Sequence, residues 1–143
     1  MPAAEIFTDG ACAGNPGPGG WGAILRLDGA GEIEMNGGAK DTTANRMELT
    51  AAIMALIRVP IPHRLRIITD SQYLISGHAA LARWRENGWR RRRGQPVKNR
   101  DLWRSLAALT RRHDVEWIWV KGHSGHCENE RCDTLAKSAI PAK

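Results

Sequence analysis

The chain has 143 residues, 42% of them hydrophobic, and a formal net charge of +6 at pH 7. This length and apolar content suit one domain with a single core and exclude an intrinsically disordered chain. No apolar run is long enough to cross a membrane and no charged-then-apolar leader opens the chain, so we expect a cytoplasmic protein. The odd number of cysteines, Cys12, Cys127 and Cys132, favours reduced thiols over a disulfide framework.

Three β-strands are predicted near the N-terminus, over residues 4–12, 20–28 and 31–38. A Gly/Pro-rich loop joins the first strand to the second, and a turn at residues 28–31 joins the second to the third. Because these connections are short, we expect the three strands to form an antiparallel meander.

Helices and strands alternate over the rest of the chain. A buried helix follows the N-cap candidates Thr42 and Thr43 and runs to about Arg58. After it we expect a strand at 65–69, short helices at 71–77 and 81–86, a helix at 99–112, a strand at 115–120 and a last helix at 128–139. This order predicts a mixed α/β sheet with helices on its faces, in one domain spanning residues 1–143.

Four acidic residues lie at the edges of these elements. Asp9 ends the first strand, Glu48 lies near the start of the buried helix, and Asp70 closes the fourth strand. Asp133 lies beside the apolar stripe of the last helix, four residues before Lys137. Taken singly, each acid fits a structural role: a turn, a helix N-terminus, a helix cap or a surface ion pair.

Taken together, the four acids favour a different role, because a mixed sheet could bring them to one place. Open α/β sheets have their sites at the carboxyl ends of strands, where Asp9 and Asp70 both lie. Clustered carboxylates repel one another unless a positive charge compensates them, and Mg²⁺ prefers carboxylate oxygen. A pair of such ions could clamp the attacking water and the leaving oxygen of a phosphodiester, which also suits a basic protein.

An ordered set of motifs extends over almost the whole chain. The motifs are Thr8-Asp9-Gly10, Gly14-Asn15-Pro16-Gly17-Pro18-Gly19-Gly20, Asn45-Arg46-Met47-Glu48, Thr69-Asp70-Ser71-Gln72-Tyr73, Pro96-Val97-Lys98-Asn99, Val120-Lys121-Gly122-His123-Ser124-Gly125-His126 and Glu128-Asn129-Glu130-Arg131-Cys132-Asp133. In this order they resemble bacterial type 1 ribonuclease H (ribonuclease HI). The resemblance implies a ribonuclease H-like fold, with a five-stranded mixed sheet of three antiparallel strands and then two parallel additions.

The resemblance also implies an activity. The family hydrolyses the RNA strand of RNA–DNA hybrids with two Mg²⁺ ions, which Mn²⁺ could replace, and leaves 5′-phosphate and 3′-hydroxyl ends. We therefore expect a monomeric endonuclease whose partner is an RNA–DNA hybrid duplex.

The catalytic residues follow from the same resemblance. Asp9, Glu48, Asp70 and Asp133 match the family's metal-binding carboxylates. His123, which on its own reads as an exposed loop histidine, matches a family residue that helps to position water or release product.

Two further groups of residues match family positions that contact the hybrid. Those near the cut in the RNA strand are Cys12, Asn15, Asn45 and Gln72, and those of a pocket for a DNA-strand phosphate are Thr43, Arg46 and Asn99. Ala44 departs from the family pattern, because relatives commonly carry Asn at this position.

A basic, Trp-bearing segment at about residues 80–100 is predicted to protrude and to bind nucleic acid. It contains Trp84, Arg85, Trp89, Arg90, Arg91, Arg92 and Arg93. A charge run is usually only a solvated face, but consecutive Arg residues beside Trp favour phosphate contact, since Arg pairs bidentately with phosphate oxygens. By resemblance this is the family's basic protrusion, which grips the DNA strand, although the further Trp that relatives often carry one turn before Trp84 is missing.

Three alternatives remain open on sequence grounds. His123, His126, Cys127 and Cys132 could form a structural zinc site, although their spacing fits no common zinc signature. A non-catalytic nucleic-acid-binding domain would use only the basic segment and would have no need of four acids. Transposases, integrases and junction resolvases share the fold and its acidic cluster, but the residues expected to contact 2′-hydroxyls favour a hybrid nuclease.

Overall fold

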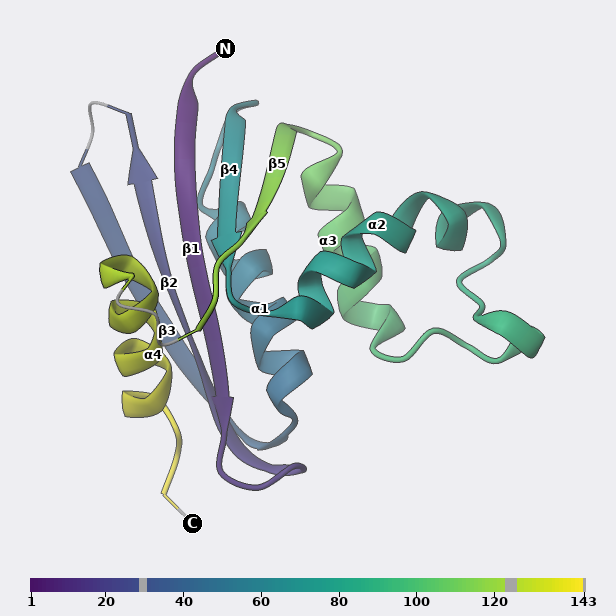
Figure 1. Ribbon diagram of the computed structural model, residues 1–143, viewed down its shortest axis with the longest axis horizontal. Helices are drawn as coiled ribbons and strands as arrows, with labels where there is room; N and C mark the ends of the chain where they lie inside the picture. The colour runs from purple at the N-terminus through teal and green to yellow at the C-terminus, as the bar shows by residue number, and fades with distance from the viewer. Residues whose placement is uncertain (29–30, 123–125, 143) are drawn as a thin grey trace.

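The computed structural model describes residues 1–28, 31–122 and 126–142, and its central element is a five-stranded sheet (Figure 1). The strands are β1 (Ala3–Cys12), β2 (Gly17–Leu27), β3 (Gly31–Thr42), β4 (Arg64–Thr69) and β5 (Asp114–Trp119), in the order β3-β2-β1-β4-β5. β1, β2 and β3 pair antiparallel, whereas β4 pairs parallel to both β1 and β5. The predicted mixed sheet is confirmed.

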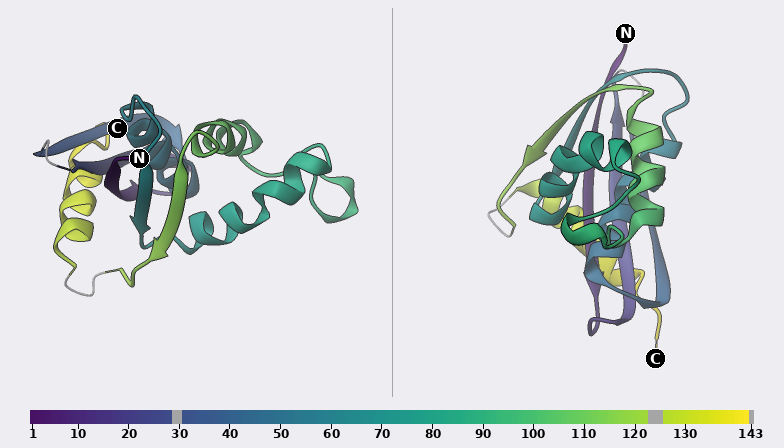
Figure 2. Two further views of the ribbon diagram at one scale, coloured as in Figure 1. Left: turned by 90° about the horizontal axis from the view of Figure 1, so that it is seen from above. Right: turned by 90° about the vertical axis from the view of Figure 1, so that its right-hand side faces the viewer.

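Helices cover both faces of this sheet (Figure 2). They are α1 (Ala44–Ile57), α2 (Gln72–Glu86), α3 (Arg100–Thr110) and α4 (Cys127–Ser138), with a short 3-10 helix, η1 (Arg92–Gly94), between α2 and α3. Successive strand residues point to opposite faces, so Ile6 joins the core beneath α1 while Phe7 joins a smaller core beneath α4. None of the helices within the described ranges is long and apolar enough to span a bilayer.

The sequence prediction of two short helices at 71–77 and 81–86 is wrong, because the structure has one continuous helix, α2. Gly77, at the predicted end of the first helix, is instead a packing residue. A Cβ atom built on it would lie 2.1 Å from two ring carbons of Trp103 on α3. The missing side chain therefore lets Trp103, which is 1% exposed, pack directly against the helix backbone.

The end of α2 and the chain up to α3 extend away from the sheet (Figures 1 and 2). Trp84 links this extension to the core, since its ring centroid lies 5.6 Å from that of Trp103 and 6.4 Å from that of Trp89. The segment predicted to protrude therefore extends beside the sheet, and the adjacent rings of Trp89, Trp84 and Trp103 connect it to the core.

Gly77→Ala is expected to destabilise the protein by about 1–3 kcal/mol, because the added methyl group overlaps a buried and rigid indole ring. At an ordinary helix position the same change would be stabilising by up to about 1 kcal/mol. Urea unfolding of Gly77→Ala beside the exposed neighbour Ser76→Ala measures the difference. Equal or greater stability of Gly77→Ala than of the parent protein would show that the close contact is not real.

Candidate functional site

Asp9 and Asp70 lie side by side because their strands are parallel neighbours in register. Thr8 in β1 is paired with Thr69 in β4, so the residue after each lies at the same edge of the sheet. Asp9 is 6% exposed, and one of its carboxylate oxygens accepts a hydrogen bond of 2.9 Å from the backbone N–H of Gly10. Asp70 follows the carboxyl end of β4, as the sequence predicted, whereas the prediction that Asp9 ends its strand is wrong, because β1 continues past Asp9 to Cys12.

Glu48 reaches this edge from α1, because Gly10 lets the helix approach β1 closely. A Cβ atom on Gly10 would lie 2.6 Å from the backbone nitrogen of Glu48. The helix starts at Thr43, whose hydroxyl oxygen accepts from the backbone N–H of Arg46 at 3.2 Å. As a result, carboxylate oxygens of Asp9, Glu48 and Asp70 all lie within 4.8 Å of one another.

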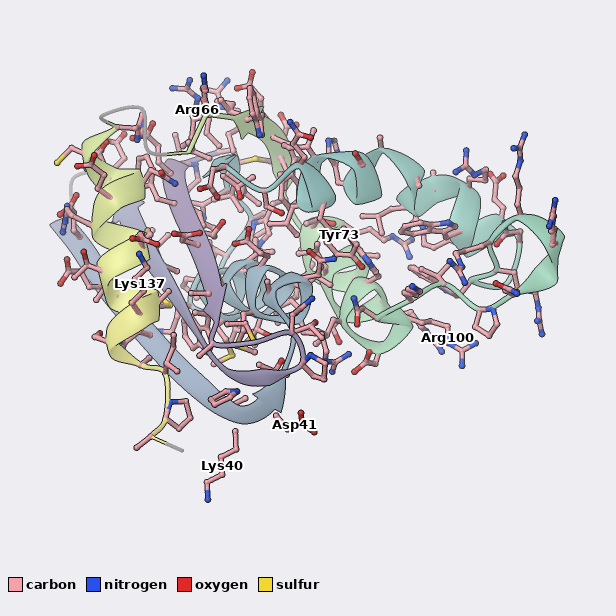
Figure 3. All side chains as sticks on the ribbon, turned by 60° about the horizontal axis from the view of Figure 1, so that its bottom comes forward. Lys40, Asp41, Arg66, Tyr73, Arg100 and Lys137 are labelled. Atoms are coloured by element: carbon pink, nitrogen blue, oxygen red, sulfur yellow. The ribbon has the colours of Figure 1, made fainter. Side chains whose placement is uncertain are left out.

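Asp133 approaches the cluster from the other face of the sheet, on α4. Gly22 in β2 allows this approach, since a Cβ atom there would lie 2.5 Å from the carbonyl oxygen of Cys132. Asp133 is close enough to Asp9 to act on its pKa, but its carboxylate is paired with Lys137 on the same helix at 3.0 Å (Figure 3). Three of the four predicted acids therefore form one group, and the fourth lies beside it.

Burial and mutual repulsion keep protons on the central carboxylates. Burial first, and then the charges of Asp70 and Asp133, raise the pKa of Asp9 from 3.8 to about 8. Burial first, and then the charges of Asp9 and Asp70, raise the pKa of Glu48 well above its ordinary range. Oε1 of Glu48 is buried and, among the described residues, has no hydrogen-bond partner.

These properties fit a hard divalent cation. Carboxylate oxygens are the ligands that Mg²⁺ and related ions prefer, and a cation would replace the protons and relieve the repulsion. The unpartnered Oε1 of Glu48 would then gain a ligand. The group of Asp9, Glu48 and Asp70 can therefore hold a metal ion.

Asp70 also has support from β5 and the segment that follows it. The indole N–H of Trp119 donates to the backbone carbonyl of Asp70 at 3.1 Å. A Cβ atom on Gly122 would lie 2.8 Å from Oδ2 of Asp70. The sequence analysis did not predict this contact of Trp119, because no sequence pattern indicates it. His123, which was predicted to act at this site, lies outside the described residues.

The residues predicted to contact RNA lie on or beside the elements that carry the acids: Cys12 ends β1, Asn15 lies in the loop after it, Asn45 is in α1 and Gln72 begins α2. The thiol of Cys12 lies 3.4 Å from the carbonyl oxygen of Gly17. The side-chain oxygen of Asn15 accepts from the backbone N–H of Ala44 at 3.1 Å, which joins the Gly/Pro-rich loop to the start of α1 beside Asn45. Gln72 is exposed at the first position of α2.

Hydrogen bonds link the three residues predicted to form a phosphate pocket, Thr43, Arg46 and Asn99. Arg46 on α1 donates to the side-chain oxygen of Asn99 at 3.2 Å, and Thr43 caps the same helix. Asn99 is held in the left-handed conformation, with φ 58°, and donates to the hydroxyl of Tyr73 at 2.9 Å (Figure 3). The sequence analysis missed a further member of this group, Asp101, which forms an ion pair with Arg46.

The extension beyond α2 carries a dense positive charge. Arg83, Asn87, Arg90, Arg91 and Arg92 line a hollow of about 640 Å³ on it. The side chain of Asn87 bonds both the N–H and the carbonyl of Arg90, which fixes the turn. Within the ranges that the structure describes, none of these arginines forms an ion pair with an acid, so their charge is available to an anion.

The described residues give no support to a zinc site. His126 uses Nδ1 to accept from the backbone N–H of Asn129 at the start of α4. Cys132 is fully buried in the core beneath α4, and this burial raises the pKa of its thiol, whereas Cys127 is exposed. Among the described residues, the acidic group is the one cluster of potential metal ligands.

Comparison with known proteins gives one family. The family model of RNase H matches residues 1–141. Ribonuclease H of Dechloromonas aromatica is 58% identical over 137 residues, which cover 95% of this chain and 92% of that protein. Ribonuclease H of Pelobacter propionicus is 55% identical over 137 residues, with coverage of 95% and 83%.

Solved structures agree with these relatives. The crystal structure of LC9-RNase H1, described as a type 1 RNase H with the type 2 active-site motif, has a TM-score of 0.85 at 33% identity. It covers 98% of this chain and 72% of its own. LC11-RNase H1 in complex with an RNA/DNA hybrid has a TM-score of 0.70 at 20% identity, covering 96% of each chain, and shows the same fold.

Asp9→Asn is expected to stabilise the metal-free protein by about 1–4 kcal/mol at high pH, because it removes a repelled buried charge. The folded-state pKa of Asp9, about 8, lies above its ordinary value of 3.8. The contribution of the Asp9 carboxyl to folding stability is therefore fully present below pH 3.8, its ordinary pKa, and is lost as the pH rises through about 8.

Urea unfolding in EDTA at about pH 5 and about pH 9 measures this difference. The stabilisation should be larger at the higher pH, and the exposed Asp41→Asn serves as the control. An equal effect of Asp9→Asn at the two pH values would contradict the raised pKa.

Proposed function

The chain belongs to the ribonuclease H family, and we propose that Asp9, Glu48, Asp70 and Asp133 form the metal site at which it cleaves the RNA strand of RNA–DNA hybrids. The observation that carries this proposal is the cluster of three carboxylates, two of them buried, whose oxygens lie within 4.8 Å of one another where β1 pairs with the end of β4. Bound cations would offset the repulsion within this group and give it a role in phosphodiester cleavage. The acids, the basic extension and the family membership together favour a catalytic nuclease over a binding module.

Two Mg²⁺ ions, which Mn²⁺ could replace, fit these donors. When bound, they supply the positive charge that favours attack of water on the RNA phosphate and departure of the 3′-oxygen, leaving 5′-phosphate and 3′-hydroxyl ends. Asp9 and Glu48 contribute buried oxygens, and Asp70 is steadied by Trp119. Asp133 joins them from α4 once its carboxylate turns from Lys137.

His123 completes the proposed catalytic set. It follows Gly122, whose backbone lies against the carboxylate of Asp70. This sequence neighbour supports a role for His123 in positioning water or releasing product at the same site.

The hybrid is proposed to lie across the start of α1, with one strand on each side. Cys12, Asn15, Asn45 and Gln72 would meet the RNA strand near the acids, where contact with 2′-hydroxyls distinguishes RNA from DNA. The pocket of Thr43, Arg46 and Asn99 would hold a phosphate of the DNA strand. The protrusion, with Trp84, Arg85, Trp89 and Arg90, Arg91, Arg92 and Arg93, would hold the same strand further along.

We further propose that residues 1–143 act as one catalytic domain, as a monomer, in the cytoplasm.

Asp70→Asn is expected to reduce cleavage of a hybrid by about 10³-fold or more, because it removes a negatively charged metal ligand of the site. Affinity for the hybrid, measured in EDTA, should change little, since the proposed contacts to both strands remain. Gel analysis of an end-labelled hybrid and an anisotropy titration measure the two quantities. Cleavage at the parent rate would mean that the metal site is wrongly placed.

Replacing Arg90, Arg91, Arg92 and Arg93 with Ala is expected to weaken hybrid binding. The dependence of log affinity on log salt concentration should also flatten, by about one unit for each arginine that contacts a phosphate. A matched variant removes the same charge away from the protrusion, through Arg58, Arg64, Arg111 and Arg112, which lie after α1, at the start of β4 and after α3 and are all exposed. An equal loss of slope in both variants would indicate net charge rather than contact by the protrusion.

A further inference from the structure

Arg46, the cation of the proposed DNA-phosphate pocket, is already held by an acid. Its NH1 donates to Oδ1 of Asp101 at 3.1 Å and its NH2 donates to Oδ2 at 2.9 Å. The two residues come from the first turns of α1 and α3, which lie side by side. This two-point contact fixes the plane of the guanidinium as well as its position.

A second contact fixes the same guanidinium from another side. NH1 also donates to the side-chain oxygen of Asn99, whose amide donates in turn to the hydroxyl of Tyr73. That hydroxyl accepts a further bond of 3.0 Å from the indole N–H of Trp103, which is 1% exposed. Arg46 is therefore joined through Asn99 and Tyr73 to the packed core.

These contacts leave one edge of Arg46 for a ligand. NH1 and NH2 meet Asp101, and Nε has no hydrogen-bond partner in the part of the chain that the structure describes. Nε–H and the second hydrogen of NH2 lie on the same edge and point the same way, as a pair of donors that matches two phosphate oxygens.

Solvent exposure limits what the pair with Asp101 can add to stability. The Asp101 side chain is 65% exposed and that of Arg46 is 36% exposed, and ion pairs at such positions contribute about 0–1 kcal/mol. An acid that merely lay near a DNA phosphate would weaken binding by repulsion. The geometry gives Asp101 a different use, which is to hold the free edge of Arg46 in place before the ligand arrives.

We propose that Asp101 is a positioning residue for the DNA strand: it orients Arg46 so that the Nε and NH2 edge faces a backbone phosphate. This inference rests on the proposed function, because it takes the pocket of Thr43, Arg46 and Asn99 to be a DNA-phosphate site. The inference predicts that removing the negative charge of Asp101 weakens binding of the hybrid, whereas removing an acid near a polyanion would ordinarily strengthen it.

The test is the affinity for a fluorescently labelled RNA–DNA hybrid, measured by anisotropy in EDTA so that no cleavage occurs. Asp101→Asn keeps an oxygen for the N-terminus of α3 but loses the charge, and it should bind about two- to five-fold more weakly, the range of an exposed ion pair. Its salt slope should stay unchanged, because no phosphate contact is lost. Asp101→Glu, which retains the charge, should restore most of the affinity.

The control is Glu86→Gln, which removes the same charge from an exposed position on the basic extension without touching Arg46. It should bind equally well or more tightly. Arg46→Ala should weaken binding and lower the salt slope by about one unit. The double variant of Arg46 and Asp101 should bind no worse than Arg46→Ala alone, because Asp101 acts through Arg46.

Each other outcome has a defined meaning. If Asp101→Asn binds as tightly as the parent or more tightly, Asp101 is a bystander or a competitor, and the inference is overturned. Additive losses in the double variant, or a loss that follows a lowered thermal midpoint, would show that Asp101 acts by stabilising α3. If Arg46→Ala itself binds normally, the proposed DNA pocket is wrong, and the inference falls with it.

Discussion

The repulsion among Asp9, Glu48 and Asp70 is the constraint on which the rest of the structure depends. Their oxygens lie within 4.8 Å in a buried place, so the fold must hold them together against an unfavourable interaction. It does so with rigid elements, because the β1–β4 pair in register and the close approach of α1 to Gly10 hold the backbones that carry these side chains near one another. The acidic cluster thus lowers the stability of the fold at the place where metal binding requires negative charge.

The remaining charges are arranged so that they do not compete with this site. A row of alternating charges crosses all five strands on the face that carries α4, each paired with its neighbour in register: Glu32, Arg26, Glu5, Arg66 and Glu116. Arg66, at one end of this face, is labelled in Figure 3. Each exposed pair contributes little to stability, but the alternation of signs leaves little net charge along the row. Among the described residues, the arginines that line the hollow on the extension beyond α2 belong to no such pair.

Much of this arrangement could be predicted from the sequence, because strand patterns and chain order carry it. Asp9 follows the apolar half of β1 and Asp70 follows β4, and parallel pairing of the two strands places these residues side by side. The pairing of Arg46 with Asp101 could not be predicted, since it joins residues 55 positions apart and depends on how α1 and α3 pack. Gly77 misled the analysis for a similar reason: its role is to admit Trp103, a partner that local propensity does not reveal.

The most direct test of the account is cleavage of one end-labelled duplex sequence in three forms, RNA–DNA, RNA–RNA and DNA–DNA, each with Mg²⁺ and with EDTA. We expect the RNA strand of the hybrid to be cut, only when Mg²⁺ is present, and the other two duplexes to remain intact. Binding of the hybrid without any cutting would contradict a catalytic role for the acidic cluster. Cutting of DNA–DNA would contradict the proposed choice of substrate and favour a recombination nuclease of the same fold.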